Sequence, residues 1–219
     1  MHRGDFHMHT YFSHDCMTSP EALVRRCESV GLDCIAVTDH NSLAGAQAVK
    51  PLASFIVILG EEIKSTAGEI TGLFLTEEVP AGLSPVETAK RIKDQGALVS
   101  VPHPFSGRGR SSLAEQSLTE VLPYVDLIER FNARTMVQAS NLAARAFAEE
   151  HGLVATAVSD SHTLGELGRT YTEFPEFDGT PEGFKEAPRE ARLVEHPAGR
   201  FVHGYTAINK LRHKFFTVP

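Results

Sequence analysis

Histidine and carboxylate side chains gather near the start of the chain and recur at intervals along it. Residues 5–15, DFHMHTYFSHD, contain three histidines and two aspartates. His7 and His9 alternate around Met8, and Asp160 and His162 repeat this spacing. In an extended strand, alternate residues point to the same face. Imidazole and carboxylate groups without cysteine suit Zn, Mn, Fe and similar divalent ions. These segments therefore predict a metal centre, although one His-x-His pair alone could equally serve packing or lie on the surface.

Nucleophilic catalysis by a serine or cysteine triad is the alternative chemistry for these histidines. The sequence places no serine or cysteine in an elbow-like turn between a strand and a helix. Five candidate histidines also exceed the need of a triad. Metal binding is therefore the favoured interpretation.

Alternating strand and helix patterns would position these residues. Ser-Pro pairs at Ser19 and Ser84 are typical helix starts, and Gly31, Gly96 and Gly152 are typical ends. The predicted helices span residues 19–32, 42–50, 84–96, 138–152 and 199–216. The predicted strands span residues 4–10, 33–40, 54–62, 69–76, 97–104, 124–132 and 153–162. The strand at 69–76 could run antiparallel. A closing strand and helix are expected within residues 171–219.

Strands separated by helices predict a mainly parallel sheet that is covered on both faces. At least six such units favour an α/β barrel over an open sheet. The predicted strands end in HMH, TDH, GEE, VPHP, ERFN and SDSH. Since the carboxyl ends of parallel strands meet at one rim, these residues should form a ring there.

Composition limits the possible functions. The 219 residues are 42% hydrophobic and 22% charged, which is enough for one globular core. The net charge is 21 − 28 = −7, which argues against broad nucleic-acid binding but leaves room for a small phosphorylated substrate. No stretch resembles a signal peptide or a membrane span of about 18 apolar residues. Three cysteines cannot all pair within the chain, so a reducing, cytoplasmic location is expected.

Together, these segments resemble the PHP (polymerase and histidinol phosphatase) superfamily of metal-dependent phosphoesterases. The resemblance rests on HMH with a following Asp, VTDHNSLAG, LGEEI, VPHPF, LIERFNAR and SDSH, all in the family's order. It covers about residues 4–170, and implies that residues 1–219 form a single PHP domain. The implied fold is a distorted (β/α)7 TIM-like barrel with up to three metal ions at the C-terminal rim of its strands.

The resemblance also implies the ligands of two or three divalent ions (Zn, Mn or Fe). The ligands of the first ion would be His7, His9, Glu62 and Asp160. Glu62 would bridge to a second ion held by His103, where Asn132 stands in place of a histidine found in some members and is a weak neutral ligand. The third ion would be bound by Asp15, His40 and His162. The residues expected to act in catalysis are Glu62, Asp160 and His162.

Two neighbouring residues compete for ligand positions. Glu62 is preferred to Glu61 because the family pattern ends in Gly-x-Glu, here Gly60-Glu61-Glu62. His14 is a weaker alternative to Asp15.

Arg108 and Arg110, in the segment SGRGR, could clamp a phosphate through charge-assisted hydrogen bonds, unless this segment is only a surface loop. Arg134 and Arg169 are weaker candidates for the same role.

The expected activity is hydrolysis of phosphate esters, with a metal-bound hydroxide as nucleophile. Small phosphomonoesters, such as nucleotides or compounds like histidinol phosphate, are the favoured substrates. The alternatives are a nuclease or exonuclease of the same superfamily and a non-catalytic metal-binding regulatory module. A nuclease would need a basic groove, which the net charge of −7 does not favour. A non-catalytic module would have lost several ligands, whereas here only the Asn132 position departs from the pattern.

Overall fold

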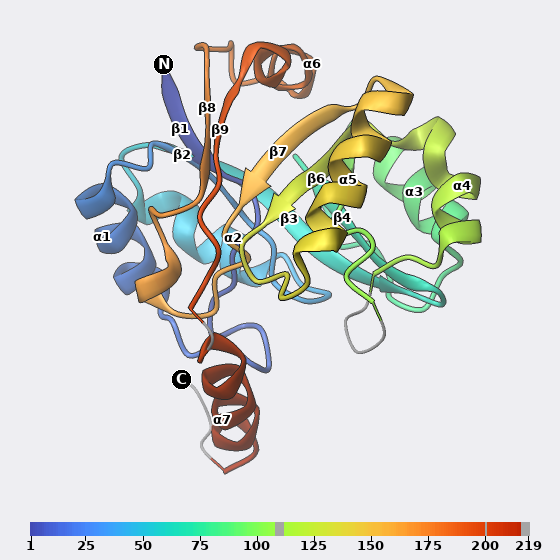
Figure 1. Cartoon of the computed structure of the whole chain (residues 1–219). Coiled ribbons are helices and arrows are strands. Elements are labelled where there is room, and N and C mark those ends of the chain that lie inside the picture. The colour runs from blue at the N-terminus through green and yellow to red at the C-terminus, as the bar shows by residue number, and fades with distance from the viewer. Residues whose placement is uncertain (108–111, 200, 216–219) are drawn as a thin grey trace.

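The computed structural model describes residues 1–107, 112–199 and 201–215 (Figure 1). The strands in these ranges are β1 (His2–Asp5), β2 (Cys34–Val37), β3 (Ile56–Ser65), β4 (Gly68–Leu73), β5 (Leu98–Val101), β6 (Leu127–Asn132), β7 (Val154–Val158), β8 (Tyr171–Phe174) and β9 (Arg192–Val194). The α-helices are α1 (Pro20–Val30), α2 (Ala44–Val49), α3 (Pro85–Lys93), α4 (Glu115–Val121), α5 (Gln138–His151), α6 (Pro181–Glu186) and α7 (Val202–Phe215).

The described strands form one sheet in the order β7-β6-β5-β4-β3-β2-β1-β8-β9. Strand β4 is antiparallel to β3 and β5, and β8 is antiparallel to β1 and β9. A parallel bridge between Met8 and Ser161 joins the segment after β1 to the segment after β7. The backbone N–H of Ser159 also donates to Oδ1 of Asp5 (3.0 Å). These contacts bend the sheet into a nearly closed barrel, which confirms the predicted distorted TIM-like fold.

The predicted element boundaries differ from the structure in informative places. Strand β1 ends at Asp5, so His7 and His9 follow the strand instead of lying within the predicted 4–10 segment. Helix α4 is absent from the predicted elements, and its first residue follows Ala114, whose side chain makes no capping hydrogen bond. The C-terminal part contains two strands and α6 besides the expected closing helix. The prediction that residues 1–219 form a single domain stays a prediction.

Helix starts and ends follow the local rules that predict them. The side chain of Ser19 accepts a hydrogen bond from the N–H of Ala22, and Pro20 is the first residue of α1. Gly31 ends this helix with φ of 74°, a left-handed conformation that favours glycine. Ser84 and Pro85 begin α3 in the same way.

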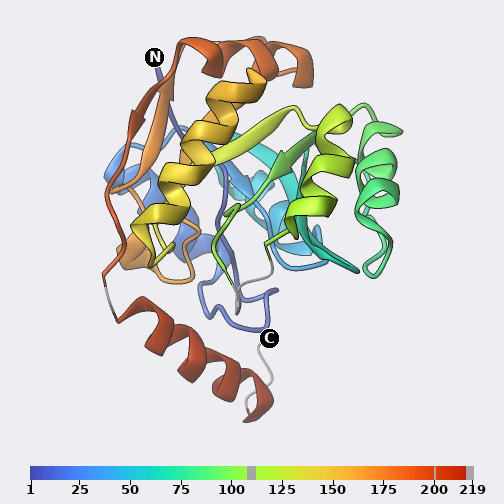
Figure 2. The same cartoon turned by 45° about the vertical axis from the view of Figure 1, so that its right-hand side comes forward.

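The two ends of the barrel are closed differently. Phe184 of α6 packs edge-on against Phe6, with ring centroids 4.8 Å apart, and also contacts Phe174. These rings belong to an apolar cluster with strand residues such as Leu127 and Val154. Figures 1 and 2 show α6 at one end of the molecule and α7 at the other. None of the described helices has the length and apolar character that crossing a membrane requires.

Candidate metal centre

An open cavity of about 400 Å³ lies among the segments that follow the parallel strands. It brings most of the predicted metal-binding side chains together with residues of α7. The lining residues are His14, Asp15, His40, Asn41, Glu62, Lys64, Glu69, His103, Arg134, Asp160, His162, His203, Thr206 and Lys210. The predicted ring at one rim of the barrel is therefore present as a cavity.

The predicted ligands of the first ion converge closely. Nε2 of His7 lies 3.1 Å from Nε2 of His9. Oε2 of Glu62 lies 3.4 and 3.6 Å from these two nitrogens, and Oδ1 of Asp160 lies 3.8 and 3.6 Å from them. Ligands about 2.1 Å from a tetrahedral ion are about 3.4 Å apart, so this spacing fits one divalent cation.

Glu62 connects this group to the others. Its Oε1 lies 2.8 Å from Nε2 of His103, while Oε2 lies 2.9 Å from Nδ1 of His40. The side chain is 1% exposed. Burial alone would raise the pKa of Glu62, but His7 and His40 outweigh burial and hold this pKa well below its usual value. Glu62 is therefore a carboxylate whose two oxygens face different sets of predicted ligands.

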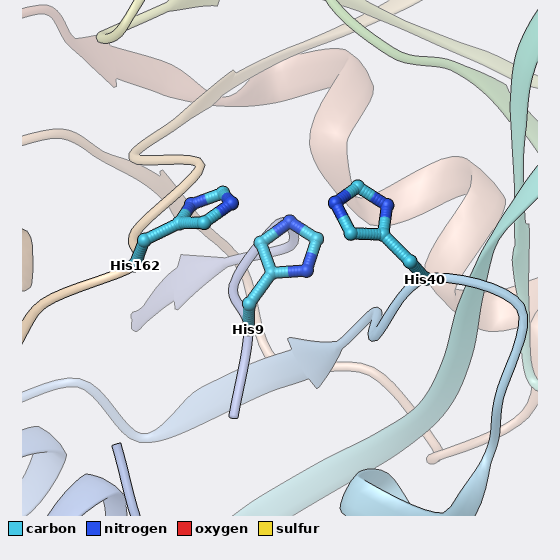
Figure 3. A group of neighbouring side chains, drawn as sticks. All are labelled: His9, His40 and His162. Carbon is cyan, nitrogen blue, oxygen red and sulfur yellow. The ribbon is translucent and has the colours of Figure 1, made fainter. Parts of the chain in front are cut away.

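The third group surrounds Asp15. Its Oδ1 lies 3.3 Å from Nε2 of His162 and 3.6 Å from Nε2 of His40. This oxygen is buried and has no hydrogen-bond partner among the described residues. Figure 3 shows His9 between His40 and His162, and its ring centroid is 4.6 and 4.2 Å from theirs. A buried carboxylate oxygen that is not hydrogen-bonded and faces two imidazoles fits a cation-binding position.

Hydrogen bonds to the other ring nitrogens orient the histidines. Nδ1 of His9 lies 3.1 Å from Oγ of Ser13, and Nδ1 of His162 lies 3.0 Å from the carbonyl oxygen of Asp160. Oγ of Ser13 in turn donates to Asp39 (2.6 Å). Donation from Nδ1 in both rings leaves Nε2 with a lone pair for a metal ion.

Helix α2 needs a glycine where it packs against this support. A Cβ on Gly45 would lie 1.8 Å from Oδ2 of Asp39 and 2.5 Å from Oγ1 of Thr10. Asp39 accepts hydrogen bonds from the N–H and hydroxyl of Thr10 and from Ser13. The close approach of α2 to Asp39 therefore explains the glycine of the VTDHNSLAG segment.

Two of the predicted ligands lie on unusual backbone. His103 has φ of 27° and Asp160 has φ of 53°, and neither is a glycine. Such conformations cost free energy and persist where the surrounding structure fixes them, often at functional sites. Imidazole nitrogens and carboxylate oxygens at ligand spacing, with an unpartnered buried oxygen on Asp15 in the described part of the chain, together fit a site for divalent ions.

Comparison with known proteins agrees with this geometry. A family model described as PHP domain matches residues 5–81, and one described as PHP-associated matches residues 138–193. An uncharacterized protein of Methanocaldococcus jannaschii, MJ0417, is 36% identical over 178 residues, which cover 80% of this chain and 71% of that protein. The chain belongs to the PHP family. A second protein of that organism, MJ1587, is 38% identical over 48% of this chain and 68% of its own length.

Solved structures share the PHP fold. A two-domain protein of Bacteroides vulgatus containing a predicted PHP-like metal-dependent phosphoesterase superposes with a TM-score of 0.68 at 22% identity. The match covers 89% of this chain but 64% of that one, so the chain spans less than two thirds of its length. The lesion-specific endonuclease of Pyrococcus furiosus gives a TM-score of 0.62 at 17% identity, over 87% of this chain and 57% of that one. At these identities the similarity establishes the fold alone.

Glu129 and Asn132 hydrogen-bond to residues of the PHP centre and hold them in place. Oε1 of Glu129 lies 2.6 Å from Nδ1 of His7, and Oε2 accepts the N–H of His103 (2.6 Å). The side-chain NH2 of Asn132 donates to Glu129 (2.8 Å) and Asp160 (3.2 Å), and its oxygen accepts the N–H of Arg134. Asn132 is completely buried. Its predicted role as a metal ligand stays a prediction, and its contacts are those of a residue that positions two carboxylates.

The two competing residues have distinct surroundings. Oε2 of Glu61 accepts the N–H of Val79 (2.9 Å), away from the cavity. Burial raises the pKa of Glu61 to about 7, with a smaller contribution from Glu78. His14 is exposed and forms a possible ligand group with Asp15 and His40. The geometry thus separates Glu61 from the PHP centre and leaves His14 at its margin.

The predicted phosphate clamp has only one described member in the cavity. Arg108 and Arg110 lie outside the described residues. Arg134 lines the cavity but is 3% exposed, and its guanidinium donates to the hydroxyl of Thr206 and the carbonyl of Val202 in α7. Arg169 is not one of the described residues that line the cavity.

Sequence reasoning missed Glu69 and Lys210. Glu69 forms a possible ligand group with His40 and Glu62, and its Oε2 lies 3.6 Å from Nε2 of His103. Burial, followed by the charge of Glu62, raises the pKa of Glu69. Lys210 of α7 lies 3.6 Å from Asp15. The local sequence carries no signal for Glu69 or Lys210, because neither follows a parallel strand.

Proposed function

We propose that this PHP protein is a metal-dependent hydrolase of phosphate esters. The observation that carries the proposal is the position of Glu62, whose Oε1 faces His103 while Oε2 faces His7, His9 and His40. A carboxylate with two separately engaged oxygens can bridge neighbouring cations. Two or three divalent ions, Zn, Mn or Fe, are proposed as the cofactors. The PHP family match and the PHP-like phosphoesterases among the structural neighbours support the same reaction class.

The proposed ligands are the eight predicted residues that converge here: His7, His9, Asp15, His40, Glu62, His103, Asp160 and His162. When bound, divalent ions would hold phosphate oxygens and lower the pKa of a coordinated water. Ser13 and Glu129 hold the rings of His9 and His7 in the orientation that presents Nε2. Glu62, Asp160 and His162, which we propose act in catalysis, are each at most 5% exposed and line the cavity that would receive the ions and the substrate.

Small phosphomonoesters are the proposed substrates. The cavity is bordered by α7 through His203, Thr206 and Lys210, which limits the space above the ligands. The net charge of −7 gives no general attraction for nucleic acid. A nuclease activity is the second candidate, because a lesion-specific endonuclease shares the fold. We also propose that the chain acts in a reducing compartment such as the cytoplasm, since its three cysteines are buried and remain in the thiol form.

A substrate panel on defined metal forms tests this proposal. The protein would be stripped with a chelator and reloaded separately with Mn, Fe or Zn. The panel comprises p-nitrophenyl phosphate, bis-p-nitrophenyl phosphate, histidinol phosphate, nucleoside monophosphates and a DNA duplex with an abasic site. We expect release of inorganic phosphate from monoesters by a metal-loaded form and none from the chelated protein. Preferential DNA cleavage would establish the nuclease alternative, and tight metal binding with no hydrolysis of any ester would establish a non-catalytic module.

A further inference from the structure

Helix α7 presents its polar face to the metal centre. His203, Thr206 and Lys210 line the cavity and are spaced by three and four residues, which places them on one side of a helix. The large apolar side chains of this segment are instead exposed: Phe201 83%, Tyr205 58%, Ile208 51% and Leu211 58%. Burial of apolar surface therefore does not explain the orientation of α7, whereas its polar contacts with the site do.

Arg134 holds α7 against the rim. Its guanidinium donates to the carbonyl oxygen of Val202 (3.2 Å) and to the hydroxyl of Thr206. Nε2 of His203 lies 3.1 Å from the carbonyl oxygen of Arg134. These contacts fix the first turns of α7, and Lys210 follows Thr206 by one helical turn on the same face. The position of Lys210 over the cavity is thus a consequence of packing at the other end of the helix.

Three lysine or arginine side chains line the cavity within the described part of the chain: Lys64, Arg134 and Lys210. Arg134 is buried and bonded to α7, as above. Nζ of Lys64 lies 3.8 Å from Glu69 on the neighbouring strand. Nζ of Lys210 lies 3.6 Å from Oδ2 of Asp15, and its side chain is 51% exposed on a long, flexible stem. Lys64 is about as exposed (49%), but its partner Glu69 is not among the eight proposed ligands. Of the three, Lys210 is therefore the one whose exposed ammonium group lies beside a proposed metal ligand.

We propose that Lys210 binds the anionic group of the substrate above the metal centre, which makes α7 a substrate-binding element. This inference rests on the proposed phosphoesterase function. A divalent ion held by Asp15 would neutralise the charge that attracts Lys210 in its absence. The ammonium group would then find its counter-ion in a phosphate that is drawn to the same ions. An ammonium–phosphate contact is charge-assisted and supplies affinity without a role in bond breaking.

Binding of inorganic phosphate to the metal-loaded protein tests the proposal by calorimetry. The variants are Lys210→Ala, Lys210→Arg and, as a matched control, Arg212→Ala, which removes one positive charge from an exposed position on the same helix. Metal content and the thermal unfolding midpoint would be measured for each. We expect Lys210→Ala to weaken phosphate binding about tenfold, Lys210→Arg to restore most of the affinity, and Arg212→Ala to change it less than about twofold. The KM of a phosphomonoester should rise in Lys210→Ala with little change in kcat.

Three results would overturn the proposal: no phosphate binding to the metal-loaded wild type, unchanged affinity in Lys210→Ala at equal metal content, or equal losses in Lys210→Ala and Arg212→Ala. The binding assay does not need turnover. Lys210-dependent phosphate binding without hydrolysis of any ester would therefore support this inference while contradicting the proposed function. Ester hydrolysis by a protein whose phosphate binding does not depend on Lys210 would support the proposed function and contradict this inference.

Discussion

Nδ1 of His7 lies 2.6 Å from Oε1 of Glu129, and both side chains are buried. A carboxylate behind a metal-binding histidine fixes the ring and increases the basicity of its other nitrogen. Burial alone would lower the pKa of His7, but the charges of Glu129, Glu62 and Asp160 raise this pKa well above its usual value. We therefore propose that Glu129 acts on the metal centre through His7, although it is not itself one of the proposed ligands.

Replacing Glu129 with glutamine should weaken metal binding about tenfold to hundredfold. The neutral amide loses the charge that supports His7, and its oxygen cannot replace both carboxylate oxygens, one of which accepts the N–H of His103. Metal dissociation constants from chelator competition would measure the effect. Glu120→Gln, an exposed change on α4, is the control and should leave these constants unaltered. Equal affinity in the Glu129 and Glu120 variants would show that Glu129 does not support the centre.

The paired variants Glu62→Gln and Glu61→Gln test which glutamate is the bridge. An amide at position 62 cannot carry the negative charge that holds two cations together, so activity should fall by on the order of hundredfold or more. Glu61→Gln should cause a much smaller loss, because Glu61 accepts the N–H of Val79 and an amide oxygen can do the same. Phosphate release and metal content would be measured for both variants. A larger loss in Glu61→Gln than in Glu62→Gln would show that Glu61, not Glu62, is the bridging glutamate of the GEE segment.

Much of the centre follows from the sequence because most of its residues follow parallel strands. His7, His40, His103 and Asp160 belong to different segments, and the strand-end rule alone brings them to one rim. Glu69 could not be found this way, since β4 reverses direction and begins, instead of ending, near the rim; its pairing with Lys64 depends on the register of the β3–β4 hairpin. The role of Lys210 depends on how α7 packs, which no local pattern specifies.

Asp5 should make stability depend on pH. Complete burial raises its pKa from 3.8 to about 7, and its Oδ2 is buried without a hydrogen-bond partner among the described residues. The folded state therefore binds this proton more tightly than the unfolded state, so the stability that the group contributes is present below about pH 4 and is lost as the pH rises to about 7. Measured without metal, the free energy of unfolding of Asp5→Asn relative to that of the wild type should rise by on the order of 4 kcal/mol between about pH 4 and pH 8.

Denaturant unfolding of both proteins across this pH range measures that difference. The comparison with the variant cancels the titration of groups that do not interact with Asp5. A difference that is constant from pH 4 to pH 8 would show that Asp5 ionises normally in the folded protein. An asparagine oxygen can still accept the N–H of Ser159, so loss of this hydrogen bond should not obscure the result.

The three cysteines should resist alkylation in the folded protein. Each is buried and in the thiol form, and burial raises the pKa of Cys16 and of Cys27 to about 12. Thiolates are the reactive species, so iodoacetamide at pH 8 should label none of the three before unfolding and all three after it. Mass spectrometry of the intact chain counts the labels. Rapid labelling of Cys16 in the native protein would contradict its burial beside His9 and His162, whose carbonyl oxygens accept from its thiol.

The number of metal ions bound per chain tests the central claim most directly. Glu62 faces His103 through one oxygen and His7, His9 and His40 through the other, and Asp15 faces His40 and His162. Elemental analysis after reloading with Mn, Fe or Zn and removal of unbound ions should find two or three ions per chain, and fewer in Glu62→Gln. One ion or none per chain with each metal, or an unchanged number in Glu62→Gln, would contradict a centre bridged by Glu62.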